Sequence, residues 1–162
     1  MNTLISQFLH HLSYERRLSW HTVEAYRADL EHFNVWAKTK IAGEDTIARL
    51  DHYHLRDYLA FCHHRYKNVS IARRLSALRA FLRYLVQMDI IKASPADLIE
   101  NPKVTKPLPK PVTVEEAFLL CDVERGDDAV AERDKIICEI LYASGMRISE
   151  LTNLDIDHVD IQ

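Results

Sequence analysis

Basic side chains are concentrated between residues 65 and 92, a segment with seven lysines and arginines and a single acid, Asp89. At about 100° per residue, one side of a helix here, opposite an apolar stripe, would carry Arg73, Ser76, Ala80 and Arg83. Two small residues between two arginines would let the helix backbone approach a major groove, where guanidinium groups reach phosphates or guanine edges. The row predicts contact with a nucleic acid. A solvated helix face is the alternative interpretation.

Other side chains could extend this contact. Arg74 and Arg79 flank the row, where they could meet phosphates or merely cover the apolar edge with their stems. Thr22 and Arg27 lie early in another predicted helix, whose N-terminus can itself hold a phosphate. Three lysines alternate with prolines further along the chain, where an extended backbone could follow phosphates by charge alone: Lys103, Lys106 and Lys110.

The charge of the chain changes sign near this proline-rich stretch. Residues 1–110 carry 17 basic and 11 acidic side chains, a net of +6, whereas residues 111–162 carry 4 and 13, a net of −9. Four prolines between residues 102 and 111 oppose helix formation and favour a semi-rigid linker. We therefore predict a first domain over residues 1–101, a linker over 102–111 and a second domain over 112–162.

Apolar periodicity predicts a mainly α fold. Only 3 of the 162 residues are glycine, and the apolar residues recur at spacings of three and four. Ser19 is a candidate N-cap, and Gly145 a candidate residue for ending a helix. The predicted helices span about 3–13, 20–38, 51–65 and 70–88 in the first domain, which makes a four- to five-helix bundle, and about 113–121, 127–144 and 146–153 in the second. Residues 154–162 alternate loosely and could begin a strand.

Three motifs agree in order and spacing with a known family. They are Thr-Val-Glu-Ala-Tyr-Arg-Ala-Asp-Leu over 22–30, Arg-Arg-Leu-Ser-Ala-Leu-Arg-Ala-Phe over 73–81, and Leu-Tyr-Ala-Ser-Gly-Met-Arg-Ile-Ser-Glu-Leu over 141–151. Together they resemble the tyrosine recombinases, most closely the Xer-type chromosome-dimer resolvases, with phage integrases as more distant relatives. The third motif is the most specific, because it matches the first catalytic-arginine box of that family.

The resemblance implies a C-shaped clamp on double-stranded DNA, with an N-terminal SAM-like core-binding bundle, a linker that crosses the duplex, and a catalytic domain that begins near Val112. It also implies that Arg147 binds the scissile phosphate, because a planar bidentate donor can neutralise the charge that grows on a pentacoordinate phosphorus. An ordinary surface arginine after a glycine is the alternative. Glu150 could orient the guanidinium, or could be a capping or surface carboxylate.

The resemblance further implies that the chain is an N-terminal fragment, natural or engineered. The family's later catalytic residues, including the nucleophilic tyrosine, would lie beyond Gln162, and the seven tyrosines present are better interpreted as core or rim residues. We expect a DNA-binding chain that is monomeric without DNA and forms no phosphotyrosyl intermediate. Its full-length parent would work as a tetramer of identical or sister recombinase protomers. The alternatives are a fragment of a mobile-element integrase, a helix-turn-helix-like regulator, or a helical protein-interaction module.

Composition argues against several other classes of protein. Three widely spaced cysteines without a C-x-x-C pair support neither a disulfide framework nor a zinc knuckle, and the nine histidines lack ligand spacing. No glycine-rich loop suited to a phosphate is present, so we expect no metal and no cofactor. The sequence also has no apolar run of about 18 residues and no signal-peptide pattern at its start. We expect a cytoplasmic protein without membrane contact.

Overall fold

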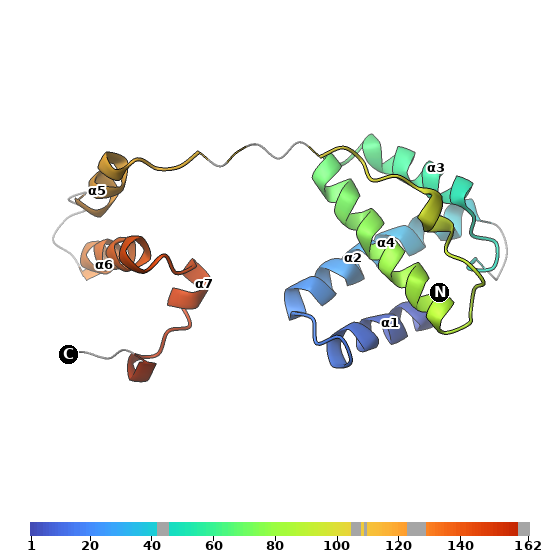
Figure 1. The fold of residues 1–162 in the computed structure, drawn as a ribbon, viewed down its shortest axis with the longest axis horizontal. Coiled ribbons are helices and arrows are strands. Elements are labelled where there is room, and N and C mark those ends of the chain that lie inside the picture. Colours follow the sequence, from blue (N-terminus) through green and yellow to red (C-terminus); the bar gives the residue numbers. More distant parts are fainter. Residues whose placement is uncertain (42–45, 105–107, 109, 123–128, 159–162) are drawn as a thin grey trace. The chain divides into compact units, whose positions relative to one another are not determined.

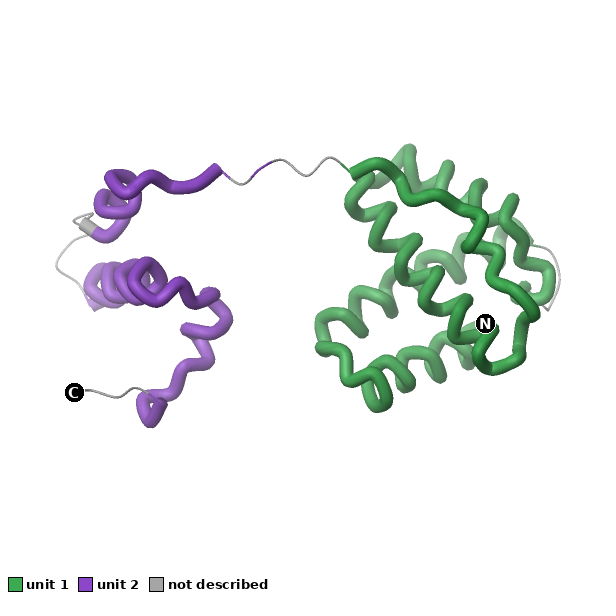
Figure 2. Tube along the Cα trace, in the orientation of Figure 1, with its two compact units in different colours: residues 1–106 green, residues 107–162 purple. Residues whose placement is uncertain are grey.

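The computed structural model describes residues 1–41, 46–104, 108, 110–122 and 129–158, and within these ranges it contains helices and no strand. The chain divides into two units, Met1–Lys106 and Pro107–Gln162 (Figure 2). The prediction of a mainly α fold is confirmed. None of the described helices combines the length and the apolar character needed to cross a lipid bilayer.

The described residues of the first unit form four α-helices and one short 3-10 helix, whose arrangement is seen in Figure 1. They are α1 (Asn2–Tyr14), α2 (Trp20–Lys40), α3 (His52–His63), α4 (Asn68–Gln87) and η1 (Pro95–Leu98). The predicted helices agree with these bounds to within about two residues at each end. Side chains fix two of the helix starts: Ser19 Oγ accepts a hydrogen bond from the Thr22 N–H, and Asp51 Oδ1 accepts one from the His54 N–H.

Helix α4 is the centre of the first unit, since it packs against α1, α2, α3 and η1. Its apolar stripe is fully buried and consists of Ile71, Leu75, Leu78, Leu82 and Leu85. The aromatic rings of Phe8 and Phe81 meet edge to face between α1 and α4, with their centroids 5.5 Å apart. Each buried leucine stabilises the bundle by about 1.5–3 kcal/mol relative to an exposed one. The fold therefore fixes which side of α4 can face solvent.

The second unit contains α5 (Val114–Asp122), α6 (Ala129–Ser144), α7 (Ile148–Leu151) and the 3-10 helix η2 (Ile156–His158). Gly145 ends α6 with φ of +67°, and its N–H donates to the Leu141 carbonyl, as predicted for a residue just past a helix. The expectation of a strand over 154–162 is wrong where the structure describes this segment, because residues 156–158 form a 3-10 turn. Residues 159–162 lie outside the described part of the chain.

Candidate nucleic-acid interface

The predicted row on α4 lies largely on the outside of the bundle. The side chains of Arg73 and Arg83 are 46% and 67% exposed, and Ser76 is exposed between them, with its hydroxyl donating to the Ala72 carbonyl at 2.9 Å. Ala80 is half-buried and packs against the core. Both arginines at the ends of the row therefore reach solvent.

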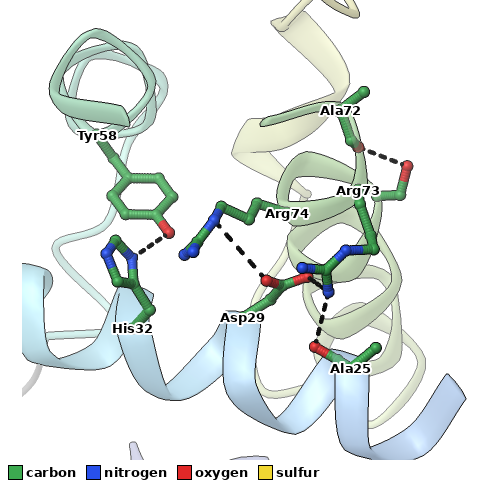
Figure 3. Close-up of polar contacts among 8 residues, drawn as sticks. Ala25, Asp29, His32, Tyr58, Ala72, Arg73 and Arg74 are labelled. Atoms are coloured by element: carbon green, nitrogen blue, oxygen red, sulfur yellow. Dashed lines mark hydrogen bonds and ion pairs between the residues drawn. The ribbon is translucent and has the colours of Figure 1, made fainter. Parts of the chain in front are cut away.

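Arg73 is held at one edge by helix α2. Its Nη1 donates to Asp29 Oδ2 at 2.5 Å and to the Ala25 carbonyl at 3.1 Å (Figure 3). The Asp29 side chain is only 2% exposed. Burial raises the pKa of the Asp29 carboxyl above its ordinary value, while the charges of Arg73 and then Arg74 act in the opposite direction. The described contacts of Arg73 thus leave its Nε and Nη2 donors for other partners.

Arg74 follows Arg73 directly in the sequence but points into the bundle. Its side chain is 11% exposed, and its Nε lies 3.8 Å from Asp29 Oδ1. Its guanidinium carbon lies 4.2 Å from the centre of the Tyr66 ring, which is a cation–π contact. Arg74 is therefore part of the packing between α2 and α4, which limits its access to an external phosphate.

A histidine and two tyrosines complete this polar cluster. His32 Nδ1 lies 2.8 Å from the Tyr58 hydroxyl, and His32 Nε2 lies 3.1 Å from the Tyr66 hydroxyl. Figure 3 shows Arg74 between Tyr58 and Asp29. Burial, followed by the positive charges of Arg74 and Arg65, lowers the pKa of His32. The pKa of the fully buried Tyr58 is raised, chiefly by burial. Neutral His32 and Tyr58 therefore fit beside the arginine.

Arg79 and Arg83 differ in their partners although they share α4. Arg79 donates from Nη2 to the Ile99 carbonyl, from Nη1 to Asn101 Oδ1, and from Nε to the Ala96 carbonyl at 3.4 Å. Arg83 has a looser ion pair, with 3.6 Å between its Nη2 and Oδ1 of the exposed Asp97. Arg79 therefore fastens the segment around η1 to α4, whereas Arg83 remains open to solvent.

Apart from Lys106, the remaining predicted contact residues lie at the surface or at its edge. The Thr22 hydroxyl is 2.9 Å from Ser19 Oγ at the start of α2, and Arg27 Nε donates to Glu24 at 3.0 Å. Lys103 is exposed, and its carbonyl accepts from Asn68 Nδ2 at 3.1 Å. Lys110 is exposed in the second unit, and Lys106 lies outside the described residues.

The arginine box forms the start of α7. Arg147 is the N-cap residue; its backbone N–H donates to Glu150 Oε2 at 2.8 Å, and its Nη1 donates to Glu150 Oε1 at 2.7 Å. These two contacts lower the pKa of Glu150, the backbone hydrogen bond most. One carboxylate thus caps the helix and holds the guanidinium. The Arg147 side chain is still 81% exposed.

Comparison with known proteins decides the family. The family model described as "Phage integrase, N-terminal SAM-like domain" matches residues 5–88, more than half of the chain. The chain belongs to the phage integrase family. The matched region covers most of α1 and all of α2 to α4, with the whole α4 row. The predicted resemblance and the SAM-like character of this helical bundle are confirmed.

Several curated relatives of this integrase-family chain are recombinases by name. Proteins called tyrosine recombinase XerC are 39% identical over 163 residues in Pseudomonas putida (strain W619) and 36% identical over 160 residues in Myxococcus xanthus. These alignments cover 99% of this chain and 54% and 53% of the two relatives. The chain thus spans about half the length of the curated relatives it matches. No solved structure matches it significantly.

The sequence interpretation of this integrase-family domain missed Asp29 and His32. Asp29 lies within the motif over 22–30, and an acid on the apolar side of α2 needs a partner. That signal was available, but the partners of Asp29 follow 44 and 45 residues later and contact it only through packing of α2 against α4.

Among the described residues, no group of three histidine, cysteine, aspartate or glutamate side chains is placed to hold a metal ion.

Proposed function

We propose that the first unit binds double-stranded DNA through the exposed row on α4, as part of a site-specific tyrosine recombinase that cleaves and rejoins DNA strands. The finer role that we infer is resolution of chromosome dimers in the cytoplasm before cell division, by tetramers of identical or sister protomers. The observation that carries this proposal is the exposure of Arg73 and Arg83 at the two ends of a row of small residues, in a domain whose relatives are named recombinases.

The dimensions of the row suit a major groove. A B-form major groove, about 12 Å wide, admits an α-helix, and Arg73 and Arg83 are ten residues apart, which is about 15 Å along the axis of α4. Between them, Ser76 and Ala80 add little bulk. The ion pair of Arg83 with Asp97 is exposed and long, so a phosphate can replace it at a cost of about 1 kcal/mol or less.

Within the same proposal, Arg147 binds a phosphate of the DNA and Glu150 orients it. The carboxylate of Glu150 uses one oxygen for the backbone and the other for Nη1, so the remaining guanidinium donors stay accessible. A charged fork of this kind forms bidentate hydrogen bonds with phosphate oxygens. We expect Arg147→Ala to leave binding by the first unit largely unchanged, since this arginine belongs to the other unit.

Fluorescence anisotropy with a labelled 30-base-pair duplex, titrated between 50 and 300 mM salt, tests the proposal. The logarithm of the binding constant should fall linearly with the logarithm of the salt concentration, with a slope of about −0.9 per phosphate contact. Arg73→Ala and Arg83→Ala should each cost about 1–3 kcal/mol where they contact bases. Arg56→Ala removes the same charge from an exposed position on α3 and is the matched control. A flat salt response, or equal losses from all three variants, would refute the proposal.

We also propose that none of the tyrosines in these 162 residues becomes covalently attached to DNA. Tyr58 is fully buried, whereas Tyr14, Tyr53 and Tyr142 are exposed but lie within helices α1, α3 and α6. Tyr142 also packs against Phe118, with 6.1 Å between the ring centres. A nicked duplex that traps phosphotyrosyl intermediates should give no adduct with this chain on a denaturing gel. A trapped adduct, mapped by mass spectrometry, would identify a nucleophile and overturn this part of the proposal.

A further inference from the structure

The buried carboxylate of Asp29 lies between two successive arginines of α4. Neighbouring residues on a helix point about 100° apart, yet Arg73 and Arg74 both approach Asp29, one at each oxygen. Arg74 comes from the inner side and remains 11% exposed, whereas Arg73 comes from the outer side and remains 46% exposed. The same carboxylate thus contacts one arginine of the core and one of the predicted DNA-binding row.

The contacts of Arg73 fix which donors remain. Both hydrogens of Nη1 have acceptors, at Asp29 Oδ2 and at the Ala25 carbonyl (Figure 3). Nε and Nη2 form the opposite edge of the planar guanidinium, with two parallel N–H groups. That edge matches the O6 and N7 acceptors of guanine or two oxygens of a phosphate. In the described contacts, the free edge of Arg73 is therefore the one suited to bidentate recognition.

The carboxylate does not cancel the charge that DNA needs. Ionised Asp29 contributes one negative charge against the two positive charges of Arg73 and Arg74, so the group keeps a net charge of +1. Because the Asp29 carboxylate is almost fully buried, a phosphate that approaches the row cannot come into contact with it. The contact between Asp29 and Arg73 is called the tether below. Asp29 lies on α2, which packs against α4, so this partner of Arg73 is held in place by the bundle.

We propose that Asp29 is a positioning residue for DNA recognition, which holds the Arg73 guanidinium with its Nε–Nη2 edge free to read a base or grip a phosphate. This inference rests on the proposed DNA-binding function. An untethered arginine loses its rotamer freedom only when it binds, whereas a tethered one has lost it already. Loss of the tether should therefore weaken binding to a preferred sequence by about two- to tenfold.

Asp29→Asn tests the tether, because the amide has the same shape without the charge. The probe is a labelled duplex obtained from a random 30-base-pair library by repeated selection on the unmodified chain, compared with an unselected duplex. Asp29→Asn should weaken binding to the selected duplex two- to tenfold. Binding to the unselected duplex should be unchanged or tighter, since the variant has one negative charge fewer. Equal changes with both duplexes would overturn the proposal.

Double variants separate positioning from a purely structural role. In an Arg73→Ala background, Asp29→Asn should change the affinity less than about 1.5-fold, because the group that it positions is gone. In an Arg83→Ala background, which removes the other end of the same row, Asp29→Asn should keep its full effect. Equal effects in the two backgrounds would show that Asp29 acts on the fold and not on Arg73.

Two further measurements keep the test decisive if Asp29→Asn fails to fold. Arg73→Lys keeps the charge and can still pair with Asp29 but has no second edge, so it should lose the preference for the selected duplex. Nitrogen relaxation of the Arg73 Nε–H group in the free, unmodified chain should show an ordered side chain. A lysine variant with full preference, or a mobile Nε–H, would overturn the positioning role. Failure of the unmodified chain to bind any duplex would instead overturn the proposed function.

Discussion

Arg79 and Arg83 lie four residues apart on α4, and replacing each of them with alanine should change a different property of the chain. Arg79 holds the segment around η1, where Ala96 is fully buried and Ile99 is 6% exposed. Arg83 has only the loose contact with exposed Asp97 among its described partners. We expect Arg79→Ala to lower stability and Arg83→Ala to lower DNA affinity.

The magnitude follows from the partners of Arg79. The hydrogen bond to the Ile99 carbonyl involves a charged donor, which contributes about 1.5–3 kcal/mol. The bond to Asn101 is exposed and adds about 0–1 kcal/mol. The contact with the Ala96 carbonyl is long, and that carbonyl keeps the Ile99 N–H as a donor, so it adds little. The sum is about 1.5–4 kcal/mol.

Urea unfolding followed by circular dichroism measures this difference. With a slope of about 1.5 kcal/mol per molar urea, Arg79→Ala should lower the midpoint by about 1–3 M. Arg83→Ala should lower it by less than about 0.5 M, since an exposed ion pair contributes little. Equal midpoints for the two variants would show that the contacts of Arg79 do not stabilise the bundle, and would return Arg79 to the candidates for DNA contact.

Three further outcomes are expected. Because folding lowers the pKa of His32, the unfolded chain binds more protons than the folded chain near and below about pH 6.5. The free energy of unfolding should therefore fall as the pH drops through that value. His32→Gln should reduce this pH dependence, measured by urea titrations at pH 7.5 and 5.5. Parallel curves for the two proteins would contradict this. Gly145→Ala places a side chain at φ of +67°, which costs about 1–2 kcal/mol. Amide hydrogen exchange at residue 145 should therefore be at least about fivefold faster than in the unmodified chain. Gly145→Asn should increase the exchange rate less. Leu78→Ala should lower the free energy of unfolding by about 2–5 kcal/mol, because the Leu78 side chain is buried. Leu98→Ala, at a 67% exposed position, should change thermal stability little. Similar losses in the two variants would show that α4 is not the centre of the core.

The helices could be predicted because their signals are local. The spacing of Ile71 through Leu85 defines α4, the hydroxyl of Ser19 starts α2, and the glycine at 145 ends α6. Each signal lies within a few residues of the feature it determines. The 3-10 turn at residues 156–158 was missed because a short, loosely alternating segment has no comparable local signal.

The partners of the arginines could not be predicted in the same way. The acceptors of Arg79 lie 17 to 22 residues further along, in a segment with little periodicity. Asp29 meets its two arginines only when α2 and α4 pack together. A pattern of residue types gives the side of a helix on which an arginine lies, but the tertiary fold decides what that arginine contacts.

The angular position of each arginine around α4 partly determines how far its side chain is exposed to solvent. At about 100° per residue, Arg74 lies about 60° from the centre of the apolar stripe, Arg79 about 80°, Arg83 about 120° and Arg73 about 160°. The two smaller angles belong to Arg74 and Arg79, whose guanidinium groups turn toward the bundle, whereas Arg73, at the largest angle, reaches Asp29 on α2 and still remains 46% exposed. Arg65 is also engaged, with its guanidinium 4.1 Å from the Phe61 ring centre. The seven basic residues of 65–92 therefore overstate the charge that this helix can offer to DNA. The salt dependence of binding should reflect the exposed members of the row, so the slope contributed by α4 should be nearer to that of two phosphate contacts than of seven.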